Sequence, residues 1–348
     1  MSGVSAMRAE RWGWIAGAAG IIGAALGWVL VPRAFAFGWL AAFAAFSGWP
    51  LGSVALLLVH SLTGGRWGDA VRPALVLGAL ATPLVAIFAI PVIVALPTLY
   101  PWARAGVALD NGWYLNVAFY AVRGVIYLVV WIVAALVALG GGPRVARMAP
   151  VTLILLAVTF TFAALDTTMS LEPKFVSSVY GMVAMAGAGL LAVAVAIVIA
   201  APTTTPAIRD DLGKLLAALT MLWTYLDFVQ LLIVWQSDLV TQAPWYLKRA
   251  FGFWGWVMAL VAVGHSAIPI LLLVWPQVRK SARALAGVAA LLVVMEVVRA
   301  WWTVLPEAPA QSALVDLACV LAVGGTGAGF ALWRSRTRRV AGVGMSHA

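Results

Sequence analysis

Residues 175–200 read FVSSVYGMVAMAGAGLLAVAVAIVIA and contain no charged side chain. A helix needs about 20 consecutive apolar residues to cross the hydrocarbon core of a bilayer. This segment is long enough and apolar enough to do so. It therefore predicts a transmembrane helix, and the pattern recurs on both sides of it along the chain.

Apolar runs of this kind occur about ten times in the 348 residues. The segments between them hold about 2 to 15 residues, which leaves no room for a soluble domain. We therefore expect an all-α integral membrane protein with about ten transmembrane helices, near residues 12–31, 34–62, 74–98, 112–138, 148–166, 175–200, 212–236, 251–274, 282–305 and 311–333.

The composition excludes a soluble protein. Hydrophobic residues make up 64% of the chain and charged residues 10%, against about 45–50% and about 25% in soluble domains. The single cysteine, Cys319, excludes a disulfide framework, a CxxC metal site or an iron–sulfur cluster within the chain. The net charge of +10 arises from Arg and Lys in short loops, so we expect no nucleic-acid partner.

The Lys and Arg residues predict the orientation, because cytoplasmic loops of membrane proteins carry an excess of them. Five lie on one side of the predicted spans, at Arg33, Arg104, Lys174, Lys248 and Arg249. Fifteen lie on the other side, which holds both ends of the chain, and we expect that side to be cytoplasmic: Arg8, Arg11, Arg66, Arg72, Arg144, Arg147, Arg209, Lys214, Arg279, Lys280, Arg283, Arg334, Arg336, Arg338 and Arg339.

The first, third and last spans carry Gly or Pro in informative positions. The first begins after Arg8 and Arg11, and its length favours a retained helix over a signal peptide. GxxxG pairs in the first and last spans permit close helix packing, either against partners or inside the protein. Three prolines predict a kinked or broken third span. These residues are Gly13, Gly17, Gly23, Gly27, Gly325 and Gly329, with Pro83, Pro91 and Pro97.

Few ionisable side chains lie inside the spans, where each costs about 2.5–3.5 kcal/mol to insert unless it meets protein or water. Arg123 shares one predicted helical face with Asn116, Tyr120 and Tyr127. Its alternatives are a structural ion pair with a carboxylate on a neighbouring helix, and a role in proton or quinone chemistry. Asp166 closes the fifth span, where solvation or helix capping is the more common role of an aspartate.

The later spans add further groups. Asp227 and Gln230 share a face of the seventh span, and the spacing of Glu296 and Arg299 allows an ion pair along one helix. His265 lies inside the eighth span, whereas His60 closes the second near the interface, so the two do not suit one haem. The candidate proton path comprises Arg123, Asp166, Asp227, His265, Glu296, Arg299 and His60, and the candidate quinone contacts are Tyr120, Tyr127 and Gln230.

Several joining segments carry distinctive motifs: HSLTGGRWG at 60–68, YLN at 114–116 ahead of Arg123, DTTMSLEP at 166–173, LGKLL at 212–216, PWY at 244–246 and VGH at 263–265. In this order they resemble the F subunit of bacterial alternative complex III, a membrane quinol:electron-acceptor oxidoreductase. The resemblance covers roughly residues 40–305. The tails are short for that family, and Asp166-Thr167-Thr168 lacks the aromatic residue expected after the aspartate.

The resemblance implies a ten-helix, NrfD-like (polysulfide-reductase-like) subunit with two four-helix bundles. The first bundle would cover residues 34–166 and the second residues 167–305, flanked by residues 1–33 and 306–348 with one helix each. The implied partners are a homologous NrfD-like C subunit, an iron–sulfur subunit and haem c subunits. The implied location is the bacterial inner (cytoplasmic) membrane, among its lipids.

The leading hypothesis is therefore a non-catalytic subunit of a respiratory quinol oxidoreductase, with no catalytic residue, metal or redox cofactor of its own. Proton conduction and quinone contact are the two further roles that we expect of it. The alternative is a stand-alone secondary transporter with repeated helix bundles, which the broken third span favours. A membrane-embedded hydrolase lacks support, because no HExxH or comparable cluster occurs.

Overall fold

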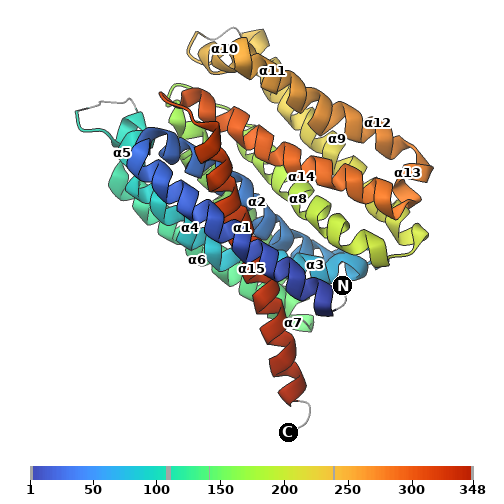
Figure 1. Cartoon of the computed structure of the whole chain (residues 1–348). Helices are drawn as coiled ribbons and strands as arrows, with labels where there is room; N and C mark the ends of the chain where they lie inside the picture. The colour runs from blue at the N-terminus through green and yellow to red at the C-terminus, as the bar shows by residue number, and fades with distance from the viewer. Residues whose placement is uncertain (1–2, 107–110, 141, 238–239, 346–348) are drawn as a thin grey trace.

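The computed structural model describes residues 3–106, 111–140, 142–237 and 240–345, with the side chains of residues 7–337 within these ranges. The described residues form helices and no strand (Figure 1). The long helices are α1 (Gly3–Leu30), α2 (Pro32–Thr63), α3 (Arg66–Leu80), α4 (Thr82–Val94), α6 (Val117–Gly140), α7 (Pro143–Thr167), α8 (Tyr180–Ala200), α9 (Pro206–Ser237), α11 (Gly252–Val261), α14 (Ala282–Val304) and α15 (Ala313–Met345).

Shorter elements join or extend these helices. They are α5 (Leu96–Leu99), η1 (Pro101–Ala103), η2 (Met169–Leu171), η3 (Ala201–Thr203), α10 (Ala243–Ala250), the π-helical turn η4 (Ala262–Ala267), α12 (Ile268–Val274), α13 (Pro276–Lys280) and η5 (Leu305–Glu307). The side chains of Arg338 and Arg339, and residues 346–348 of the predicted basic tail, lie outside what the structure describes.

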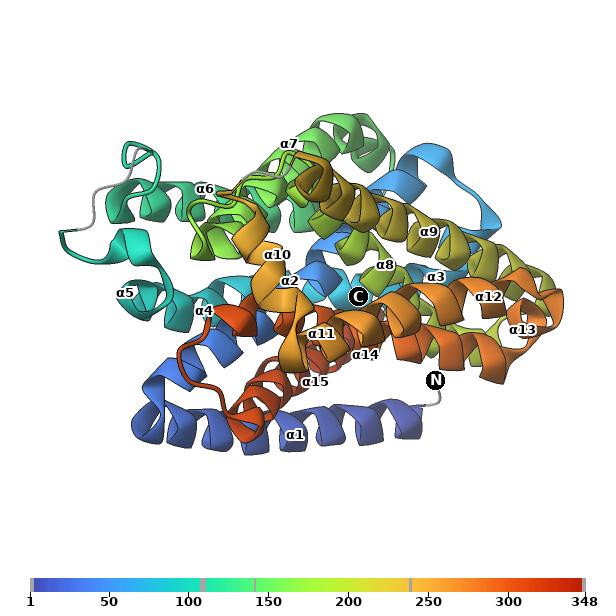
Figure 2. The ribbon, with the colours of Figure 1, turned by 90° about the horizontal axis from the view of Figure 1, so that it is seen from above.

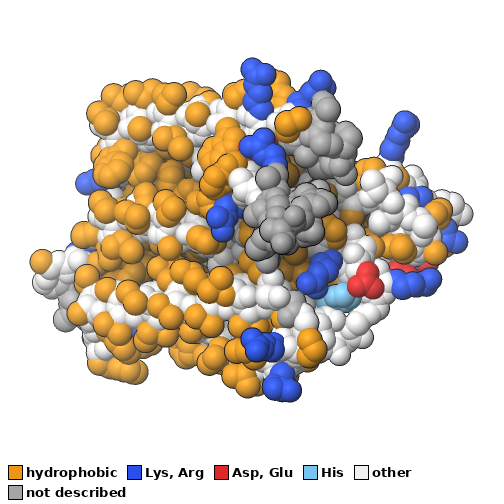
Figure 3. All heavy atoms as spheres, turned by 90° about the horizontal axis from the view of Figure 1, so that it is seen from below, with side chains coloured by type: hydrophobic (Ala, Val, Ile, Leu, Met, Phe, Trp, Pro, Cys, Tyr) orange, Lys and Arg blue, Asp and Glu red, His pale blue; other side chains and the backbone are white. Residues whose placement is uncertain are grey.

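Ten helical segments of the described chain are long and apolar enough to cross a membrane, which confirms the predicted all-α, multi-pass architecture. Their outward surfaces are apolar: Leu136 is 66% exposed and Ile154 64%. Figure 3 shows a broad hydrophobic area on the face seen from below, with most of the charged side chains toward its centre and right. The cytoplasmic location of the two ends stays a prediction.

Helices α2 and α8 form the centre of the molecule. Within the most apolar 18-residue stretch of each span, 72% of the residues are buried in α2 and 61% in α8, but only 22% in α9. Helices α3, α4, α6 and α7 pack on one side of this centre, and α9, α11, α12 and α14 on the other (Figures 1 and 2). The boundaries of the four predicted segments, residues 1–33, 34–166, 167–305 and 306–348, stay predictions.

The third span is broken twice, as its prolines predict. Helix α3 ends at Leu80, and α4 begins after Ala81, with Pro83 in its first turn. Helix α4 in turn ends at Val94, and Pro97 lies in the first turn of the short helix α5. Proline is tolerated in a first turn because its missing N–H has no partner there anyway. The third span is therefore interrupted at Ala81 and again at Ala95.

The glycines of the first and last spans pack α1 against α15 inside the protein. A Cβ added to Gly13 would lie 2.8 Å from the backbone nitrogen of Gly329, and one added to Gly325 would lie 2.5 Å from that of Gly17. Glycine is required because the two backbones touch. Of the two roles open to these glycines, the structure thus supplies the internal one.

Two expected helix boundaries differ in the structure. Helix α6 begins at Val117, and the Oδ1 of Asn116 accepts a hydrogen bond from the N–H of Phe119 at 2.9 Å. Asn116 thus caps the helix that carries Tyr120, Arg123 and Tyr127. Helix α8 begins at Tyr180 and not near residue 175, because residues 172–179 form turns beneath α10.

Candidate functional site

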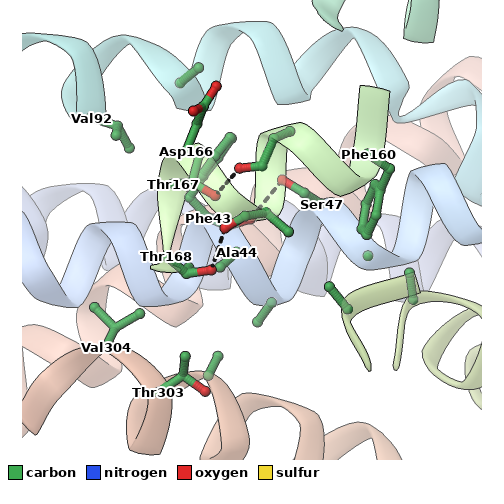
Figure 4. A pocket seen from close by; sticks show the side chains of 18 of the residues that line it. Phe43, Ala44, Ser47, Val92, Phe160, Asp166, Thr167, Thr168, Thr303 and Val304 are labelled. Carbon is green, nitrogen blue, oxygen red and sulfur yellow. Dashed lines mark hydrogen bonds between the residues drawn. The ribbon is translucent and has the colours of Figure 1, made fainter. Parts of the chain in front are cut away.

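A cavity of about 300 Å³ lies between the two groups of helices. Its walls come from α2, α4, α6 and α7 on one side and from α8, α9 and α14 on the other. Figure 4 shows Asp166, Thr167 and Thr168 at the end of α7, between Val92 of α4 and the pair Thr303 and Val304. Seven of the predicted site residues line it: Tyr120, Tyr127, Asp166, Asp227, Gln230, Glu296 and Arg299.

The first polar cluster joins α6 to the end of α7. The Nε of Arg123 donates to Oδ2 of Asp166 and its Nη2 to Oδ1, both at 2.9 Å. One turn along α6, the hydroxyl of Tyr127 donates to Oδ2 of Asp166 at 2.8 Å. Asp166 is 1% exposed, so it is neither solvated nor a helix cap, the more common roles of an aspartate at such a position. The structure thus provides the carboxylate partner that Arg123 requires.

Tyr114 completes the surroundings of Arg123 from outside the membrane span. Its carbonyl accepts from Nη1 of Arg123 at 2.9 Å, and its ring centroid lies 3.8 Å from the guanidinium carbon. Burial and the nearby Asp166 raise the pKa of the Tyr114 hydroxyl to about 12. The hydroxyl therefore stays protonated at neutral pH, and the guanidinium is enclosed on three sides.

The second polar cluster joins α14 to the eighth span. The Nε2 of His265 lies 3.0 Å from Oε1 of Glu296, while Nε of Arg299 donates to Oε2 of Glu296 at 2.9 Å. His265 is fully buried, and its ring centroid lies 4.0 Å from that of Trp223 on α9. A Cβ added to Gly187 of α8 would lie 3.1 Å from Oε1 of Glu296. The predicted pair on α14 therefore forms, with His265 as its third member.

A π-helical turn positions His265. The turn η4 interrupts the helix between α11 and α12, and inserted turns of this kind often occur at functional sites. Ser266 in the turn accepts a hydrogen bond at 2.8 Å from the hydroxyl of Thr224 on α9. The turn thus holds the imidazole between Trp223 and Glu296. Its Nδ1 is buried and has no hydrogen-bond partner among the described residues.

Asp227 is the carboxylate of the cavity that has no direct partner. It lines the cavity beside Glu296 and Arg299, yet it makes no hydrogen bond or ion pair within the described part of the chain. One turn along α9, Gln230 accepts from Ser177 at 2.9 Å and donates to the hydroxyl of Tyr246 at 3.2 Å. Asp227 is therefore free to bind a ligand or a proton in the cavity.

His60 lies apart from the other site residues. It does not line the cavity, and its Nε2 lies 3.1 Å from the carbonyl of Gly65 and 3.5 Å from Oδ1 of Asp69. Its ring also packs against Gly68, where any Cβ would clash with it. These contacts fold the turn between α2 and α3. The other predicted residues line the cavity or belong to its two polar clusters, whereas His60 does neither.

Helix α10 covers the end of the cavity next to the second cluster. Arg249 is fully buried and donates to Glu307 at 3.0 Å and to the carbonyl of Thr303 at 2.7 Å. Burial lowers the pKa of Arg249 below its ordinary value, although Glu307 opposes the effect. Lys248 bridges Glu172 at 3.0 Å and Glu307 at 2.9 Å. Trp245 of α10 and Trp302 of α14 line the cavity below these ion pairs.

Sequence reasoning missed several residues of the site. Trp223 shares the predicted face of Asp227, but nothing in the sequence distinguishes it from an ordinary buried aromatic residue. Arg249 lies in a joining segment, where arginine is typical of a solvated side chain. The PWY motif that precedes it was the available signal. Gly187 belongs to a Gly-rich helix and carries no signal of its own.

The described residues contain no group of three or more His, Cys, Asp and Glu side chains arranged to hold a metal ion. No protein-family model matches the chain, and no curated protein matches it. The resemblance to the F subunit of alternative complex III therefore depends on the motifs of the sequence, and membership of that family stays a prediction.

Proposed function

We propose that this chain is an integral subunit of a quinol:electron-acceptor oxidoreductase in the bacterial cytoplasmic membrane. Its own part is to handle protons and contact quinone, while partner proteins carry the electrons. The observation that carries the proposal is Asp227, an unpaired carboxylate in a membrane cavity flanked by two ion-paired clusters. The motifs that resemble the F subunit support the assignment to such a complex.

The two clusters are suited to different tasks from that of Asp227. Asp166 is ion-paired with Arg123, and Glu296 with Arg299, so both carboxylates are already engaged by an arginine. A group that exchanges protons needs a lone pair or proton that is not already engaged. Asp227 and the Nδ1 of His265 meet this requirement in the part of the chain described.

The cavity also fits the head of a quinone. A quinone needs an apolar cleft with one or two polar groups for its carbonyl oxygens. Tyr120, Tyr127 and Gln230 line the cavity together with apolar residues of α2 and α4. The hydroxyl of Tyr127 is already engaged with Asp166, and the amide of Gln230 with Ser177 and Tyr246, so Tyr120 is the better placed donor. This division of roles is part of the proposal.

Purification from native membranes tests the assignment to a complex. The tagged full chain is solubilised in mild detergent, and its fractions are examined for haem c absorption, iron–sulfur signals and quinol oxidation. We expect all three to co-purify with the chain. A preparation that contains the intact chain but none of these signals contradicts the proposal.

Replacing Asp227 tests the proton role. In the assembled complex, Asp227→Asn should lower proton uptake coupled to quinol oxidation by about 10²-fold, because the amide cannot exchange a proton. Asp211→Asn is the matched control, since the Asp211 side chain is 43% exposed and pairs with Arg66 away from the cavity. Unchanged proton uptake in Asp227→Asn would remove this residue from the path.

A secondary transporter is the second candidate, and one observation favours it. The third span is broken at Ala81 and Ala95, and the part of α4 before the second break lines the cavity. Broken helices at a central cavity are typical of such transporters. A transporter should move its substrate when the purified chain alone is placed in liposomes, whereas a complex subunit should not.

A further inference from the structure

Among the described residues, the exposed part of the cavity lining lies at one place. Most of its lining residues are buried or half-buried. The exposed ones all lie on two neighbouring helices, α4 and α6: Ile93 (51% exposed), Val117 (47%), Val125 (62%) and Ala121. This mouth is apolar throughout and lies on the membrane-facing surface of two predicted spans.

We propose that the mouth between α4 and α6 is a lateral portal, through which a lipid-soluble amphiphile with a long apolar tail enters the cavity from the bilayer. The inference rests on the proposed quinone contact, and a quinone is the chemical class it names. The head would reach the polar wall of the cavity, and the tail would remain between α4 and α6.

The second break of the third span explains why the two helices leave room there. Helix α4 ends at Val94, just after Ile93 of the mouth, and α5 begins at Leu96. On the facing helix, Gly124 lines the cavity, and a Cβ added to it would meet no atom within 4 Å. The end of a helix on one side and a glycine in open space on the other leave room between the two helices.

The lining is apolar at the mouth and polar deeper in the cavity, where Tyr120, Asp166 and Gln230 are buried. Val92 and Ile93 of α4 and Leu96 of α5 line the part beside the mouth. Asp227, Gln230 and Thr303 come from α9 and α14, on the opposite side of the central helices. Figure 4 shows Val92 and Thr303 on opposite sides of Thr167 and Thr168. The polar head of the amphiphile is therefore more stable inside the cavity, because the side chains at the mouth offer it no hydrogen bond.

Binding kinetics test the portal. The full chain in lipid nanodiscs is mixed with decylubiquinone, and quenching of intrinsic tryptophan fluorescence, to which Trp131 in the cavity wall contributes, follows binding. The double variant Ile93→Trp/Val125→Trp narrows the mouth. The matched control is Ile90→Trp/Val129→Trp, because Ile90 and Val129 are each 55% exposed on the same helices but do not line the cavity.

We expect the mouth variant to slow association by about tenfold, because the quinone must pass the narrowed mouth to reach its bound state. The control should match the wild type. Unchanged rates would overturn the portal, and so would a weaker Kd with an unchanged association rate, which marks ordinary contact residues. Absence of decylubiquinone binding to the wild type would overturn the portal and the quinone contact together, while co-purification decides the assignment to a complex separately.

Discussion

At the scale of single residues, Arg123 and Asp166 show how charged side chains are accommodated inside a membrane protein. Each of them alone would be strongly disfavoured there, but two parallel hydrogen bonds and the hydroxyl of Tyr127 satisfy both. The sequence places Arg123 deep in a span and Asp166 at the end of the next. It does not show that they meet, because helical periodicity fixes which residues share a face and not which way that face is turned.

Removing one partner of this pair should destabilise the protein strongly. Asp166→Ala leaves the guanidinium of Arg123 buried without its counter-charge, which typically costs about 3–5 kcal/mol. We expect a clear fall in the Tm of the full chain in detergent, and recovery of most of it in the double variant Arg123→Leu/Asp166→Leu. Lys214→Ala is the control, because Lys214 is 59% exposed and its pair with Asp210 should contribute at most about 1 kcal/mol. Equal effects of Asp166→Ala and Lys214→Ala would contradict this account.

At the scale of the element, the transmembrane spans could be predicted from the sequence. Their breaks, caps and irregular turns could be predicted only in part. Hydropathy locates the helices because lipid demands about 20 apolar residues, and the prolines of the third span locate its breaks. The start of α6 was misplaced because Asn116, through its cap, sets that helix end. The π-helical turn at His265 could not be predicted, since it depends on contacts with Trp223, Thr224 and Glu296 from other helices.

The contact between α1 and α15 yields a prediction at this scale. A Cβ at Gly20 would clash with the backbone at Ala322, so Gly20→Val should force the helices apart and cost about 1–3 kcal/mol. The expected result is a lower Tm and a lower yield of cross-linking between cysteines placed at Glu10 and Arg336. Gly189→Val is the control, because a Cβ at Gly189 meets nothing within 4 Å. Cross-linking that is undiminished in Gly20→Val would show that the two backbones need not touch.

At the scale of the whole molecule, the site forms where side chains from separate groups of helices meet. Asp166 comes from one group of helices and Asp227, Glu296 and Arg299 from the other, and they meet at one cavity beside the central helices. The chemistry of these residues could be predicted from their rarity in apolar spans. Their meeting could not, since the rotation of each helix is decided by packing against α2 and α8. His60 illustrates the difference: it has similar chemistry, but it folds a turn elsewhere.

Lys248 connects three joining segments of the molecule, and its titration gives a testable pH dependence. Burial lowers its pKa, but the hydrogen bonds from Lys248 to Glu307 and Glu172 outweigh this and raise the pKa above the ordinary value of 10.5. A raised pKa in the folded state contributes stability that is complete below about pH 10.5 and is lost as the pH rises through the folded-state value. Thermal unfolding should therefore show Tm falling more steeply above about pH 10.5 in the wild type than in Lys248→Gln.

The charge-conserving variant Lys248→Arg separates this effect from the other groups that titrate at high pH. Arginine stays protonated over the whole range, so its Tm should decline as gently as that of Lys248→Gln while starting from a higher value. If the wild type and both variants fall in parallel, the bridge to Glu172 and Glu307 contributes nothing to the pH dependence.

The close contact of α1 with α15 also has a consequence for biosynthesis. The paired residues Glu10 and Arg336 are separated by 326 positions. At the usual rate of about 5–20 residues per second, the ribosome needs roughly 16–65 s to make the chain between them. During that interval the small-residue surface of α1 lies in the bilayer without α15, the helix against which it packs. Slower translation lengthens this interval and gives other newly synthesised helices more time to pack against the uncovered surface of α1.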